Sequence, residues 1–224
     1  MSSETFLKKA RKSTITYCVV ATVIASLSFY GQYSKYVLGH GRLWGFVDFI
    51  DVDVEGNFPN WFSSTGLLVC SFLLWKTACG AKDWRIHWKL LAGIFLYLSI
   101  DEEAGIHDRI SEPLREMIHP TGFFYFAWVI PAAVLLVLFA VFFFKFWTAL
   151  PLRIRLWMMA AGVVYVGGAF FMEMLGGELH AIRSSSRITY EFIITIEEYM
   201  EMIGIGLMGY ACALSYADNS ASRS

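Results

Sequence analysis

Hydrophobic residues are gathered into six long blocks that short polar segments separate. Each block is long enough for a helix that crosses the hydrocarbon core of a bilayer, which takes about 20 residues. The pattern therefore predicts an all-α fold, a polytopic membrane bundle of about six transmembrane helices that forms one domain over residues 1–224. The expected spans are 14–31, 61–80, 88–110, 123–147, 152–182 and 190–217.

The composition agrees with a membrane protein. Hydrophobic residues make up 57% of the chain and charged residues 17%, with a mean hydropathy of +0.52. Soluble domains are typically ~25% charged. The net charge of −1 argues against nucleic acid as a partner, because nucleic-acid-binding domains carry a basic patch. The four cysteines lie in or beside apolar blocks without zinc-type spacing, so neither a disulfide framework nor a zinc finger is expected.

Basic residues in the short loops indicate the orientation of the bundle. With six spans, the N-terminal segment, the loop after the second span and the junction between the fourth and fifth spans share one side. That side holds eleven lysines and arginines in these segments, and the opposite side holds six. Because short loops rich in lysine and arginine stay in the cytoplasm, both termini are predicted to be cytoplasmic. The first span is expected to be uncleaved, since 31–34 offers no small-residue cleavage site.

Acidic residues interrupt the third, fifth and sixth spans. An acid at the centre of a membrane helix costs about 2.5–3.5 kcal/mol, so such residues normally face the bundle interior and are paired or functional. Counted at 1.5 Å per residue from the outer ends of their spans, Glu102, Glu173 and Glu201 lie at depths of ~12, ~14 and ~16 Å. Three independent segments thus place carboxylates at similar depth. We expect them to converge on an acidic pocket in the outer half, covered by the loop 36–60.

Two histidines lie close to these acids and suggest a metal. Glu103 and His107 are four residues apart on one helical face, and Glu173 and His180 are seven apart. Carboxylates with imidazoles suit iron, manganese or zinc, and a bound metal would support a metalloenzyme that acts on a lipid or another apolar small molecule. The predicted metal ligands are Glu103, His107, Glu173, His180 and Glu201. The residues predicted to support the ligands or to handle protons are Asp101, Glu102, Asp108, Glu178, Glu197 and Glu198.

Two other hypotheses explain the same acids. Neighbouring buried carboxylates share protons, so the acids could form a proton or cation pathway in a transporter or channel. Alternatively, they belong to a structural or partner-binding subunit, in which arginines on the same side neutralise them near the rim. Those arginines are Arg109, Arg115, Arg183 and Arg187.

Three motifs carry a resemblance to a known group of proteins. They are DVEGNFPNWFSS at 53–64, SIDEEAGIHD at 99–108 and IEEYMEMIG at 196–204. Together they resemble a group of uncharacterised bacterial multi-pass membrane proteins with an acidic-Asn-x-Pro-x-Trp segment, an Asp-Glu…His-Glu motif and a Glu-Glu…Glu motif. This chain has Asp108 where that group has Glu. The resemblance implies the same topology and a place in the bacterial cytoplasmic (inner) membrane, and it implies no activity.

Overall fold

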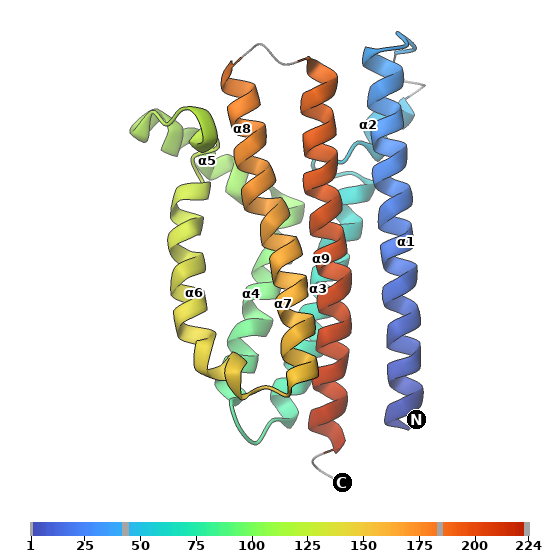
Figure 1. Cartoon of the computed structure of the whole chain (residues 1–224), viewed down its shortest axis with the longest axis vertical. Coiled ribbons are helices and arrows are strands. Elements are labelled where there is room, and N and C mark those ends of the chain that lie inside the picture. The colour runs from blue at the N-terminus through green and yellow to red at the C-terminus, as the bar shows by residue number, and fades with distance from the viewer. Residues whose placement is uncertain (1, 42–44, 183–185, 222–224) are drawn as a thin grey trace.

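Long helices packed side by side form the structure, a computed structural model that describes residues 2–41, 45–182 and 186–221 (Figure 1). These residues form helices and no strand, which confirms the predicted all-α fold class. The elements are α1 (Ser3–Tyr36), α2 (Phe46–Ile50), α3 (Phe58–Gly80), α4 (Arg85–Ala104), α5 (Ile106–Ile118), η2 (Gly122–Phe124), α6 (Val129–Ala149), α7 (Leu152–Val166), η3 (Gly167–Met172), α8 (Glu173–Ile182) and α9 (Arg187–Ala221).

Five segments of the described chain are long and apolar enough to cross a membrane. They are α1, α3, α6, the continuous segment 152–180 that joins α7, η3 and α8, and α9. The 20-residue α4 runs beside α3 through the bundle, and the acids at its end lower its hydropathy (Figure 1). Both termini lie at one end, as an even number of crossings requires (Figure 1). We call the half with the termini the terminal half and the half with α2 and α5 the loop half. The cytoplasmic location of the termini stays a prediction.

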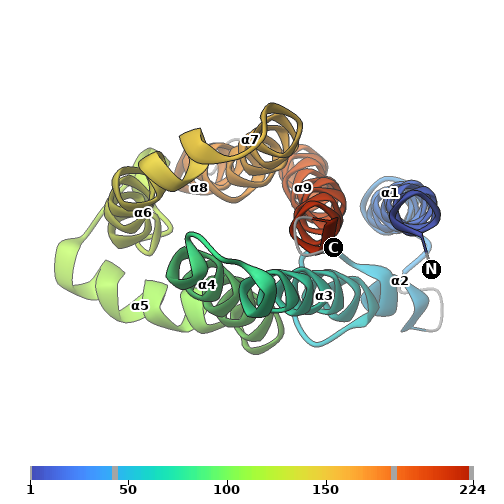
Figure 2. The same ribbon diagram turned by 90° about the horizontal axis from the view of Figure 1, so that it is seen from below.

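The third predicted span, 88–110, is too long. Helix α4 ends at Ala104, and Gly105 adopts the left-handed conformation with φ of 55°. Glycine adopts this conformation without the Cβ clash that other residues meet, so it commonly terminates a helix. The chain then turns and continues as α5, which crosses the direction of the other helices (Figure 2). His107 therefore belongs to a different helix from Glu103.

Large apolar side chains fill the terminal half. The main core cluster joins α3, α4, α6, α7 and α9, with Leu74 and Phe146 at 0% and 2% exposure. Glycines bring α9 close to the broken helix beside it: a Cβ on Gly204 would lie 2.8 Å from the backbone nitrogen of Tyr165. Without a hydrophobic driving force between helices in lipid, such close contacts between small residues supply much of the packing energy.

The loop between α1 and α3 folds onto the loop half of the bundle. The buried Asp51 accepts a hydrogen bond from Gln32 of α1, and the main-chain N–H of Val52 donates to Ser28. At the start of α3, the Asn57 side chain donates to the carbonyl of Asp51. These bonds tie 51–57 to both α1 and α3, so this part of the predicted covering loop has a fixed position above the interior.

Candidate functional site: an acidic interior in the loop half

Helix α9 contributes three glutamates to the interior of the loop half. Glu197 is buried, and Glu198 and Glu201 are half-buried. Residues four apart share a helical face, so Glu197 and Glu201 point the same way, whereas Glu198 is turned by about 100°. The Tyr165 hydroxyl of α7 donates a hydrogen bond to Glu201.

A local change of helix type positions the next acid, Glu173. Between α7 and α8 the chain forms η3, a single π-helical turn that begins with Gly167 and Gly168. A Cβ on Gly168 would lie 2.8 Å from the carbonyl oxygen of Glu197 and 3.1 Å from Cγ of Glu201. Glycine at this position therefore lets η3 approach α9 at the level of the α9 acids. Turns of this kind occur frequently at functional sites.

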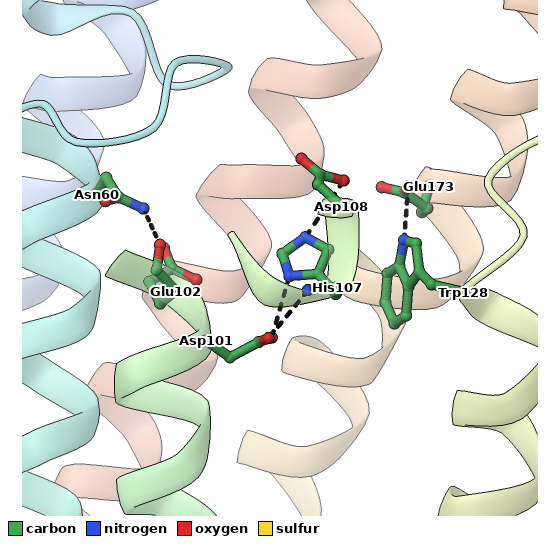
Figure 3. Close-up of polar contacts among 7 residues, drawn as sticks. All are labelled: Asn60, Asp101, Glu102, His107, Asp108, Trp128 and Glu173. Carbon is green, nitrogen blue, oxygen red and sulfur yellow. Dashed lines mark hydrogen bonds and ion pairs between the residues drawn. The ribbon is translucent and has the colours of Figure 1, made fainter. Parts of the chain in front are cut away.

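The carboxyl groups of Glu173 and Glu197 lie close enough to form a hydrogen bond with each other when one of them is protonated. The indole N–H of Trp128, just before α6, also donates to Oε1 of Glu173 at 3.2 Å (Figure 3). An ionised carboxylate only accepts hydrogen bonds, so two carboxyl groups can bond to each other only when one of them carries a proton. A proton shared between Glu173 and Glu197 would therefore satisfy this pair in the interior.

The corner between α4 and α5 supplies a histidine held by two aspartates (Figure 3). Nδ1 of His107 lies 3.0 Å from Oδ2 of Asp101, and its main-chain N–H donates to Oδ1 at 3.1 Å. Nε2 lies 3.6 Å from Oδ1 of Asp108. Burial lowers the pKa of His107, but the hydrogen bond to Asp101 and the charges of both aspartates outweigh it and raise the pKa to about 9. At neutral pH this imidazole is therefore a cation that donates a hydrogen bond from Nδ1 to Asp101 and lies within ion-pair distance of Asp108.

Glu102 joins the interior from the end of α4. Its main-chain carbonyl accepts a hydrogen bond from the Asn60 side chain of α3 (Figure 3). Its carboxyl group interacts electrostatically with Glu198 and Glu201 across the bundle. Three segments of the chain thus direct five carboxyl groups to one region. We call this set the interior glutamates: Glu102, Glu173, Glu197, Glu198 and Glu201.

The structure divides the five predicted metal ligands into two sets. Three of them, His107, Glu173 and Glu201, interact with one another electrostatically. Glu103 is exposed on α4, because the break at Gly105 separates it from His107. His180 is exposed at the far end of α8, where its ring lies 4.5 Å from that of Tyr125.

The remaining predicted residues also separate. Asp101 and Asp108 flank His107, and Glu102, Glu197 and Glu198 belong to the interior set. Glu178 instead lies against Gly122 of η2. Sequence reasoning missed Tyr165, Trp128 and Asn60. Of these only Asn60 had a signal, since it follows the proline of the Asn-x-Pro segment that carried the resemblance.

The described residues form no ready-made group of ligands for the predicted metal. Among residues 2–41, 45–182 and 186–221, no group of three or more histidines, cysteines and acids is arranged to hold a metal ion. Iron, manganese and zinc each need several protein donors around one point. The interior carboxyl groups contact each other and Tyr165 or Trp128 instead.

The predicted arginines do not neutralise the interior either. Arg187 pairs with Glu191 at 2.6 Å at the start of α9, Arg115 lies over the Tyr125 ring, and Arg109 is exposed. Arg183 lies outside the described residues. Within the described part of the chain, no lysine or arginine forms an ion pair with an interior glutamate.

The apolar spanning helices and the acids enclosed among them define a polytopic helical membrane protein. The family model described as Domain of unknown function (DUF8692) matches residues 15–215, and the chain belongs to this family. Comparisons with curated proteins and with solved structures gave no match.

Proposed function

We propose that this membrane protein is a proton-coupled carrier of the bacterial cytoplasmic membrane, and that the interior glutamates bind its protons. The observation that carries the proposal is the close approach of the Glu173 and Glu197 carboxyl groups, which can form a hydrogen bond with each other when one of them is protonated. Ionisable residues within membrane helices commonly belong to proton relays in pumps and transporters.

The charge balance of the interior supports the same function. Five carboxyl groups lie together, and the neighbouring cation among the described residues is His107. Burying a carboxylate without a partner of opposite charge costs much free energy. Protonation removes this charge where no lysine or arginine pairs with it. Proton binding changes the charge of such a site. If two conformations bind the protons with different affinity, proton binding shifts the equilibrium between them.

The two halves differ in polarity, which favours a carrier over an open channel. Asp108 is exposed at the loop end and lies beside His107, so protons can reach the acids from that side. Towards the termini, Phe95, Ile205 and Leu67 belong to a packed apolar core. A core of this kind offers no continuous polar path in this conformation, and the break at η3 gives the helix beside the site a point at which to move.

Infrared spectroscopy of the protein in proteoliposomes tests the proposal, because protonated carboxyl groups have a carbonyl band separate from that of carboxylates. We expect wild-type protein at neutral pH to show this band, and Glu173→Gln and Glu197→Gln to lose part of it. The matched control is Glu103→Gln, which alters an exposed acid one residue from the interior set. A wild type without the band, or a band unchanged in both variants, contradicts the proposal.

Elemental analysis of the same preparation, purified without chelator, separates this function from the metalloenzyme hypothesis. We expect no stoichiometric iron, manganese or zinc. Near-stoichiometric metal that disappears in Glu201→Gln would overturn the proton-carrier proposal. Proton uptake measured with a pH-sensitive dye inside the vesicles then tests transport itself, with loss expected in Glu197→Gln and retention in Glu103→Gln.

A further inference from the structure

Helix α5 differs in sequence from the spanning helices. Its 13 residues include three acids and two arginines, together with an apolar stripe at helical spacing. Ile106, Ile110 and Leu114 follow at intervals of four, and Met117 adds to the same side at seven residues from Ile110. A short helix with a polar face and an apolar face of this kind is suited to a boundary between water and an apolar phase.

The position of α5 places it at such a boundary. Gly105 turns the chain out of α4, and α5 then crosses the direction of the spanning helices at the level where α6 begins (Figure 1). Viewed along the bundle, α5 runs outward from α4 along the rim and the chain returns to α6 (Figure 2). Since α4 and α6 run through the bundle, this level corresponds to the membrane surface in the loop half.

The protein itself leaves much of the apolar stripe uncovered. Met117 is 73% exposed and Ile110 is 47% exposed. The polar side of the helix faces the protein at several points: Ser111 is buried, Arg115 lies over the Tyr125 ring, and His107 is held by Asp101. The exposed side therefore needs an apolar partner that is not a described part of this chain.

We propose that α5 lies in the lipid interface of the loop half, with Ile110 and Met117 among the upper acyl chains. The exposed apolar side of α6, where Leu135 is 66% and Val141 72% exposed, begins at the same level, and Phe123 of η2, between the two helices in the chain, is 47% exposed (Figure 1). The charges of α5 are of both signs, so burial of apolar area, more than attraction to anionic headgroups, holds the helix there. The occupant is thus the bilayer.

The position of α5 also affects the acidic interior, and this step depends on the proposed function. His107 is the second residue of α5, and its partner Asp101 is in the last turn of α4. The seating of α5 in lipid therefore fixes the angle of the α4–α5 corner, which positions His107 and Glu102. Gly105, in the left-handed conformation, connects the lipid-facing helix α5 to the end of α4 that carries Glu102.

Spin-label accessibility tests the inference on the full chain in proteoliposomes, after its four cysteines are replaced by serine. Single nitroxides are placed at 110, 117 and 112, one at a time. References are position 135 on α6 for lipid and position 4 for water, since Glu4 is exposed at the far terminus. We expect labels at 110 and 117 to be at least threefold more accessible to oxygen than to a water-soluble nickel complex, as at 135. The label at 112 should behave like that at 4.

Two results would overturn the inference. Equal nickel accessibility at 117 and 4 would place α5 in water. Labels at 110 and 117 that neither reagent reaches, and that become reachable when the protein is diluted into excess lipid, would show that a second copy covers the stripe. Because 112 and 117 share one helix, a misfolded α5 would be detected by loss of the difference between them. Infrared spectra of the interior acids report on the proposed function separately.

Discussion

In the terminal half, Leu74, Phe143 and Phe146 pack into an apolar core, whereas in the loop half carboxyl groups lie in the interior between α4, α8 and α9. Even the histidines differ. His87 lies between the rings of Phe142 and Phe146, at 5.1 and 5.5 Å, while His107 lies between two aspartates. The backbone follows the same division, because the breaks at Gly105 and η3 both occur in the loop half.

Packing therefore stabilises mainly the terminal half, and the groups proposed to bind protons lie in the loop half. Packed aromatic and aliphatic side chains hold the terminal half in one arrangement, since interiors of this density are not continuously deformable. In the loop half, helices are interrupted beside groups whose charge changes with protonation. Changes in the terminal half should therefore affect unfolding, and changes in the loop half should affect function.

The largest expected effect is on the core of the terminal half. Phe146→Ala should lower the free energy of unfolding by about 3–5 kcal/mol, because a fully buried phenylalanine is replaced by a cavity. The control is Phe144→Ala, at a position that is 61% exposed, where a change within about 0.5 kcal/mol is expected. Denaturant titration in mixed micelles, followed by circular dichroism, measures both. Equal losses would remove the distinction between core and lipid-facing positions.

The second-largest effect on the free energy of unfolding is expected at the corner between α4 and α5. Gly105→Ala should cost about 1–3 kcal/mol, because alanine is strained at φ of 55° and its Cβ would overlap the Glu55 carboxylate. Adding Glu55→Ala removes the overlap but leaves the backbone strain, so the double variant should recover only part of the loss. The same denaturant titration measures this recovery. Full recovery would show that the left-handed backbone itself carries no cost here.

Removing an interior acid should have a smaller effect on stability and a larger one on function. Glu197→Gln keeps a group that can hydrogen-bond to Glu173, and uncharged replacements of buried ionisable groups are often neutral or stabilising. We expect the unfolding free energy to stay within about 1 kcal/mol of the wild type or to rise above it. A loss as large as that of Phe146→Ala would assign the acids a structural role and erase the contrast between the halves.

The last prediction concerns the pH at which His107 titrates. Its pKa of about 9 lies above the ordinary 6.5, so its contribution to stability is fully present below pH 6.5 and is lost as the pH rises through about 9. Nitrogen NMR of histidine-labelled protein checks the pKa directly. Asp101→Asn should lower it, because the strongest hydrogen bond to the cation is removed. An unchanged titration in that variant would contradict the assigned cause.

Much of the arrangement could be predicted because it depends on local quantities. The hydrophobic blocks give the helices, and the residue count from the block ends gives the depths of Glu173 and Glu201. For Glu102 the count began at Ile110, beyond the end of α4 at Ala104, so it overestimated the distance from the end of the helix. The distance of a residue from the end of its helix does not depend on tertiary packing, since it is set by the rise per residue. Which side of each helix faces the interior was harder to predict. Glu103 and His180 were expected to point inward, but both are exposed.

The sequence by itself therefore determined an all-helical membrane protein with acids at one level of the loop half. Only the tertiary structure decided which acids meet. Helix α4 ends at Gly105, where the Glu55 carboxylate lies against the glycine and the Asn60 side chain donates to the carbonyl of Glu102. Because the helix ends there, His107 belongs to the next helix. The single π turn of η3 offsets the helical faces beyond it by about 100°, as one inserted residue does, and brings Glu173 to Glu197. The choice of face is decided by contacts between segments far apart in the chain, and periodicity within one segment does not contain them.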